Sequence, residues 1–149
     1  MNMKLSIDKT AQLMKTLVGV VLLIILSIAS LYIGFNAISM LLTEVGEVVI
    51  YYRFGLAMIP CGIGLLATLI GVIYFNLKNK RLDDVYGNAL SYTLIGSLAL
   101  AFLITWLTPS IYETRLENAG LQACEGIPAS HLPLFAKKFA ANASLCKSN

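Results

Sequence analysis

Charged side chains are absent from three long stretches of this chain. No Asp, Glu, Lys, Arg or His occurs in residues 17–43, 54–77 or 85–112. Each stretch exceeds the ~20 residues that a helix needs to cross roughly 30 Å of hydrocarbon. The missing charges therefore predict a protein with three transmembrane helices. The predicted spans are about residues 17–42, 54–76 and 86–108.

Embedded ionisable groups, which often mark ion-coupled transport, are therefore lacking as well. A carboxylate inside a membrane is costly and is usually kept because it carries a proton or a cation. Its absence argues against a coupled transporter. Three spans also provide too few walls for a pore within one copy, so a small channel or transporter is an alternative that requires oligomerisation.

Catalytic and cofactor motifs are scarce too. The chain has one His, and it contains no nucleophile elbow, no P-loop and no C-x-x-C pair. Asp83 and Asp84 are its one adjacent acidic pair, and they follow a basic run, which favours a solvated surface over a metal site. We expect a protein that is not an enzyme and that binds no cofactor and no metal.

The composition agrees with a membrane protein. Of the 149 residues, 58% are hydrophobic and 13% are charged, whereas about a quarter are charged in a typical soluble domain. The net charge of +3 is spread over both ends and one loop, so no basic patch for nucleic acid is expected. The first span is too long for the apolar core of a signal peptide, which favours a retained span. The expected partners are the lipid bilayer and another protein.

Loop charges predict the orientation. Short loops rich in Lys and Arg tend to stay cytoplasmic. Basic residues dominate segment 1–16 and the loop at 78–81, whereas the loop between the first two spans carries Glu44 and Glu47 against Arg53. We therefore expect a cytoplasmic N-terminal segment at 1–16, a bundle at 17–108 and a tail at 109–149 on the outside. The inverted orientation is the alternative.

Two short helices are predicted in this tail. Pro109 is expected to end the third span, and Ser110 with Glu113 fits a capping box for a new helix that stops at Gly120. Ser130 is a candidate cap for a second helix. Its apolar face would comprise Leu132, Phe135, Ala136, Phe139, Ala140 and Ala143. The predicted fold is thus an all-α membrane protein: three transmembrane helices plus a small extramembrane helical hairpin.

Two of the three cysteines flank the second predicted tail helix. If the tail is outside, Cys124 and Cys146 lie in an oxidising compartment, which favours a disulfide. Closing this loop would stabilise the tail by ~3 kcal/mol. Two free thiols are the alternative, and a metal site with His131 is disfavoured by the spacing. Cys61, within the second span, is expected to be a small buried packing residue.

Small residues recur at helical spacing in all three spans. Such faces allow close packing of helix backbones. We expect them to pack the bundle internally, and a docking face for another membrane protein is the alternative. The candidate packing residues are Ser30, Gly34, Gly64, Ala67, Gly71, Ser97 and Ala101.

Candidate contacts for a protein partner lie in the outer loop and the tail. Residues 48–52 are apolar and β-prone, and they either lie at the membrane surface or pack under the tail. The candidates are Glu44, Glu47, Tyr51, Tyr52, Arg53, Phe135, Lys137, Lys138 and Phe139.

The tail carries a resemblance. The tail contains the sequence G-L-Q-A-C at residues 120–124, then Pro128, then Leu145 with Cys146. This pattern is similar to the tails of small three-span bacterial inner-membrane proteins, some of which are of immunity-protein type. The resemblance implies a periplasmic tail and a protein that neutralises a membrane-acting toxin by contact. An accessory structural subunit of a larger membrane complex is the alternative function.

Overall fold

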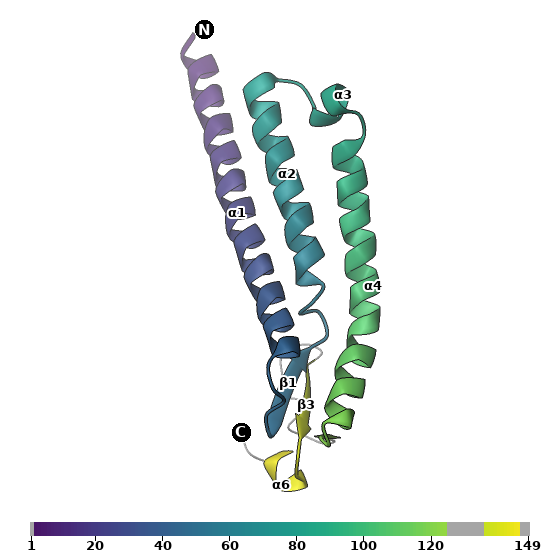
Figure 1. The fold of residues 1–149 in the computed structure, drawn as a ribbon. Helices are drawn as coiled ribbons and strands as arrows, with labels where there is room; N and C mark the ends of the chain where they lie inside the picture. The colour runs from purple at the N-terminus through teal and green to yellow at the C-terminus, as the bar shows by residue number, and fades with distance from the viewer. Residues whose placement is uncertain (1, 125–135, 147–149) are drawn as a thin grey trace.

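The computed structural model describes residues 2–124 and 136–146, and for residues 2–11 and 13 it describes the backbone alone. α2 packs against both α1 and α4, and a small sheet lies at one end of these three long helices (Figure 1). A five-residue helix, α3, connects the second long helix to the third. The helices are α1 Asn2–Leu42, α2 Met58–Lys78, α3 Leu82–Tyr86 and α4 Ala89–Asn118.

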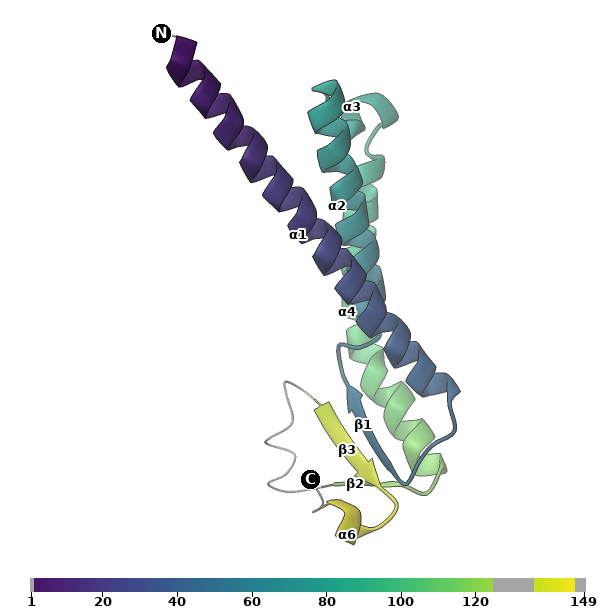
Figure 2. The ribbon, with the colours of Figure 1, turned by 90° about the vertical axis from the view of Figure 1, so that its left-hand side faces the viewer.

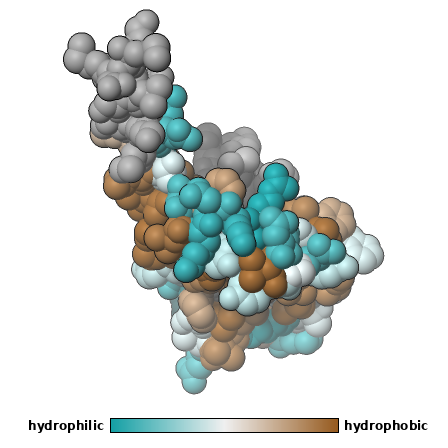
Figure 3. All heavy atoms as spheres, turned by 90° about the horizontal axis from the view of Figure 1, so that it is seen from above, coloured by the Kyte–Doolittle hydropathy of each residue, from teal (hydrophilic) through white to brown (hydrophobic). Residues whose placement is uncertain are grey.

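The three long helices confirm the three predicted spans. Each is long and apolar enough to cross a membrane. Their large apolar side chains face outward: Tyr32 is 69% exposed, Leu98 73% and Phe102 78%. Apolar surface this extensive is rare on soluble proteins and matches a surface in contact with lipid. Hydrophobic residues also border the end face of the molecule in Figure 3.

The third span does not end at Pro109, contrary to the prediction. α4 continues through Pro109 to Asn118, so its 30 residues extend about 45 Å, well beyond a hydrocarbon core. Next to the proline, the Thr105 hydroxyl donates to the Ala101 carbonyl at 2.8 Å, and the Thr108 hydroxyl donates to the Ile104 carbonyl at 2.7 Å. Pro109 removes the helical bond to the Thr105 carbonyl, so neither of these hydroxyls replaces the missing bond, and the helix continues without it.

The end of α4 follows the prediction. Gly120 has a φ of 82°, in the left-handed region that glycine enters without strain. Its N–H donates to the Glu117 carbonyl at 2.9 Å, and the Leu121 N–H donates to the Leu116 carbonyl at 3.0 Å. These two bonds form a Schellman motif, and Leu116 and Leu121 belong to one buried cluster, as this motif favours.

The tail forms part of a sheet and is not a helical hairpin. Residues 136–140, predicted as helix, form the central strand of a three-stranded antiparallel sheet with the order β1-β3-β2 (Figure 2). A single helical turn, α6, follows this strand. Ser130 and Phe135 of the predicted helix lie outside the described residues. The remaining elements are β1 Val48–Tyr52, β2 Gln122–Ala123, β3 Ala136–Ala140 and α6 Ala143–Cys146.

The register of the sheet decides which side chains face α4. Val49 pairs with Phe139 and Tyr51 with Lys137, and Ala123 pairs with Phe139 from the other side. Because neighbouring residues of a strand point to opposite faces, these five side chains share one face. We call the sheet, α6 and residues 109–121 the head.

Candidate functional site

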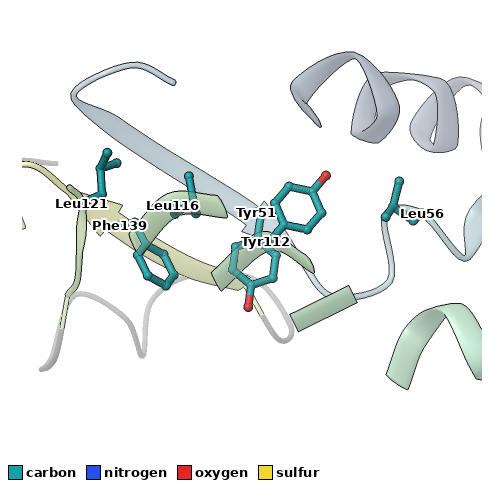
Figure 4. Packing of buried hydrophobic residues seen from close by; sticks show 6 residues of the cluster. All are labelled: Tyr51, Leu56, Tyr112, Leu116, Leu121 and Phe139. Carbon is teal, nitrogen blue, oxygen red and sulfur yellow. The ribbon is translucent and has the colours of Figure 1, made fainter. Parts of the chain in front are cut away.

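Stacked aromatic rings form the core of the head (Figure 4). The rings of Tyr51 in β1 and Tyr112 in α4 are parallel to within 5°, with centroids 4.6 Å apart. Phe139 of β3 lies 6.1 Å from Tyr51. Tyr51 and Phe139, both predicted to contact a partner, are each only 1% exposed. Their side chains therefore hold the sheet on α4 and are not available for direct contact.

Glu113 links α4 to strands β1 and β3. The Tyr51 hydroxyl donates to Glu113 Oε1 at 2.9 Å, and the Lys137 ammonium forms an ion pair with the same oxygen. Burial, and then the bond to this carboxylate, raise the pKa of Tyr51 far above its usual value. The phenol therefore stays protonated and remains a donor. Glu113, predicted as a capping residue, instead fastens the sheet to the helix.

Tyr112 and Arg115 fasten α4 to the end of α1. The Tyr112 hydroxyl donates to the Ala37 carbonyl at 2.8 Å. The Arg115 guanidinium donates to the carbonyls of Met40 at 3.1 Å and Thr43 at 2.6 Å. The last carbonyls of a helix lack partners within it and carry partial negative charge, so a guanidinium is well suited to this place.

Sequence reasoning missed two links that α4 makes: Glu113 to the sheet and Arg115 to the end of α1. The available signal was their position on α4. Residues 112, 113, 115 and 116 fall on consecutive turns, so one helix surface presents an aromatic, an acidic, a basic and an apolar residue together. The partners of these side chains are 24 to 75 positions away in sequence, and no local pattern identifies them.

The predicted disulfide is confirmed. Cys124 follows β2, Cys146 ends α6, and the two are bonded with Cα atoms 5.5 Å apart. The bond closes a loop that contains the central strand. Lys138 of that strand is 9% exposed and donates to the Cys146 carbonyl at 3.4 Å. Cys61, predicted to be buried, is instead an exposed thiol on α2.

The outer loop holds the remaining exposed candidates for partner contact. Glu44, Glu47, Tyr52 and Arg53 are all exposed, and we call these four residues the outer-loop surface. Tyr52 is 47% exposed and borders a pocket of about 480 Å³ that reaches between α1 and the head. In the tail, Lys137 is 58% exposed despite its ion pair, and Phe135 lies outside the described residues.

The small residues of α1 lie against α2. The Ser30 hydroxyl donates to the Met58 carbonyl at 2.7 Å. A Cβ added at Gly34 would lie 2.5 Å from Ile59 Cγ1, so any larger residue at this position would separate the two helices. Ser27 also donates to the Gly62 carbonyl, at 3.5 Å.

The small residues of α2 and α4 line the second helix contact. A Cβ at Gly64 would meet Ser97 Cβ at 3.4 Å, and one at Gly71 would meet Leu90 Cδ2 at 2.8 Å. Ala67 is half-buried beside this contact, and Ala101 is 7% exposed. Whether any of these faces also binds another protein stays a prediction.

Asp83 has a role at the opposite end of the bundle. Its carboxylate accepts hydrogen bonds from the Leu90 N–H at 3.0 Å and from the Ser91 hydroxyl at 2.7 Å. Asn88, directly before α4, makes no such bond, so the cap of α4 comes from α3. Among the described residues, no three His, Cys, Asp or Glu side chains are grouped as a metal site would require.

Comparison with models of protein families, with curated proteins and with solved structures finds no match to this chain. Its function is therefore argued from its own residues and geometry.

Proposed function

We propose that this chain is a bacterial inner-membrane immunity or exclusion protein, which binds a membrane-acting toxin by contact. The head is the observation that supports this proposal. Its strands come from the loop before α2 and from the tail after α4, and an aromatic core, an ion pair and a disulfide hold them together. Such a head presents a pre-organised surface, which lowers the entropic cost of recognition.

In this proposal the head is periplasmic, and the N-terminal segment and the 78–81 loop are cytoplasmic. Two independent observations support that orientation. The N-terminus and α3 lie at one end of the molecule and the head at the other (Figure 1), so the basic segments share an end, as the charge rule favours. The disulfide belongs to the head, and disulfides persist in oxidising compartments.

The outer-loop surface is the proposed contact surface. It combines two carboxylates, one guanidinium and one half-exposed aromatic ring. Tyrosine and arginine are common among residues that dominate binding energy. Tyr52 is the central candidate because it flanks the 480 Å³ pocket, into which an apolar side chain of a partner would fit.

A toxin-survival assay with matched tyrosine variants tests the proposal. Deleting the gene should sensitise cells to a membrane-acting toxin encoded beside it, and the unaltered chain should restore survival. Tyr52→Ala should weaken protection by about 30-fold, the scale of one dominant contact residue. Tyr92→Ala is the control, because Tyr92 is 71% exposed but lies near the start of α4, away from the head. Unchanged survival after deletion would reject the proposal.

An accessory subunit of a larger membrane complex is the second candidate, and one observation favours it. The first half of α1 diverges from α2 and α4 (Figure 2), and a Cβ added at Gly19 would meet nothing within 4 Å. The part of α1 around Gly19, where Leu17, Val18 and Leu22 are exposed, therefore offers an apolar surface for another membrane helix. A stoichiometric membrane partner that co-purifies in mild detergent without any toxin would favour this function.

A further inference from the structure

A second concave site lies far from the head, between α2 and α4. This groove has a volume of about 380 Å³ and opens at the end of the bundle that carries α3. Val72 and Phe75 of α2 form one wall, and Leu90 and Leu94 of α4 form the other. The walls are apolar and belong to two spans, so the groove faces the acyl chains of the bilayer.

One basic side chain lies at the mouth of this groove and two more lie near it in the sequence. Arg81 lines the groove, Lys78 ends α2, Lys80 follows it, and both lysines are exposed. Asp83 also lines the mouth, but both of its carboxylate oxygens accept hydrogen bonds from the first turn of α4. In the part of the chain that the structure describes, the Arg81 guanidinium has no hydrogen-bond or ion-pair partner. The mouth therefore offers a guanidinium that no described carboxylate pairs with directly.

Aromatic residues support placing this mouth at the depth of the lipid headgroups. Tyr74 and Tyr86 meet edge to face with centroids 6.1 Å apart, near the 78–81 loop. Tyrosines of membrane proteins concentrate at the level of lipid headgroups. The end face seen in Figure 3 is also where hydrophilic residues gather. At that depth Arg81 would lie beside the lipid phosphates, with the apolar groove beneath it.

We propose that this groove binds one anionic phospholipid, with an acyl chain between α2 and α4 and the phosphate at Arg81. Lipid chains are the solvent around the spans, so the apolar walls alone would accept any phospholipid. The basic mouth adds selectivity, because Lys and Arg near the membrane surface attract anionic headgroups. A guanidinium also pairs with phosphate through two parallel hydrogen bonds.

Native mass spectrometry of the full-length protein, released from a nonionic detergent, tests the site. The protein is titrated with phosphatidylglycerol or with phosphatidylcholine of the same chains. We expect one phosphatidylglycerol to bind in preference to phosphatidylcholine. Arg81→Gln should reduce this preference about fivefold, the effect of one basic group near an anionic surface. Lys15→Gln, which removes an exposed charge on α1 away from the groove, should leave it unchanged.

Two filling variants test the position of the acyl chain. Val72→Trp and Leu94→Trp insert a large side chain from opposite walls of the groove. Either should abolish binding of the lipid, while a cooperative thermal unfolding transition shows that the variant is still folded. Inorganic phosphate should not displace the lipid. Any of four results would overturn the proposal. The two lipids bind equally, or Arg81→Gln and Lys15→Gln have equal effects. A folded filling variant retains the lipid, or inorganic phosphate displaces it.

Discussion

Replacing Phe139 with alanine should open the head and leave the bundle intact. Phe139 is 1% exposed, belongs to the central strand and contacts the ring of Tyr51. Removing a fully buried phenylalanine side chain costs about 3–5 kcal/mol. Because each 1.36 kcal/mol is a factor of ten, the population of the opened head should rise at least about a hundredfold, up to the limit set by the stability of the head.

Hydrogen–deuterium exchange measures this opening directly. Exchange of the protected amides in β1 and β3 should accelerate by at least about a hundredfold, because local opening exposes them to water. Exchange within the membrane-spanning part of α2 should not change. The disulfide remains intact in the variant, so the effect isolates packing from the covalent link.

Phe102→Ala is the matched control for this experiment. It removes the same atoms from α4, but Phe102 is 78% exposed on the surface that faces lipid. Its head amides should exchange as in the unaltered protein. Equal exchange rates for β1 and β3 in the Phe139 and Phe102 variants would refute the conclusion that the aromatic core holds the sheet on α4.

Three further predictions concern the disulfide, the end of α4 and the buried phenol. Replacing Cys124 and Cys146 with serine should destabilise the head by about 3 kcal/mol, measured by the same hydrogen–deuterium exchange. Non-reducing mass spectrometry should show the two cysteines joined in the unaltered protein. Two alkylatable thiols would contradict this. Gly120→Ala should cost about 1–2 kcal/mol of head stability because residue 120 has a positive φ. Gly96→Ala, at an open helical position, should not destabilise the protein. Equal effects of the two substitutions would contradict the role of the left-handed turn. The pKa of Tyr51 is raised, so the unfolded chain releases this proton near pH 10 while the folded chain retains it, and head stability should fall as the pH rises above that value. Tyr51→Phe should remove this tyrosine's contribution to the loss, and an identical pH dependence in both proteins would contradict the assignment.

Features governed by local chemistry were predictable from the sequence. The absence of charge identifies the three spans because a charged side chain in the middle of a membrane-spanning helix is energetically costly. Gly120 marks the end of α4 because the left-handed turn of a Schellman motif favours glycine. The pairing of Cys124 with Cys146 followed from the presence of only one other cysteine, which lies within a span.

The tail strand was not predictable because its partners determine it. Residues 136–140 read A-K-K-F-A, and Ala and Lys favour helix over strand. Between β1 and β2, however, this segment gains backbone hydrogen bonds on both sides, and Phe139 enters the aromatic core. This tertiary context outweighs local propensity. The same holds at Pro109, where the continuing helix brings Tyr112 and Leu116 to the sheet.

The strand order also imposes a sequence of events on synthesis. β3 lies between β1 and β2, and it is the last of the three strands to leave the ribosome. β1 is made more than 80 residues earlier and has no strand to pair with until the two remaining spans, α2 and α4, have followed it. In the meantime Tyr51 lacks its aromatic neighbours, and its apolar ring is suited to rest at the membrane surface. The sheet can therefore form only after α2 and α4 have been made, and a chain stopped before residue 136 would leave β1 and β2 without their shared partner strand.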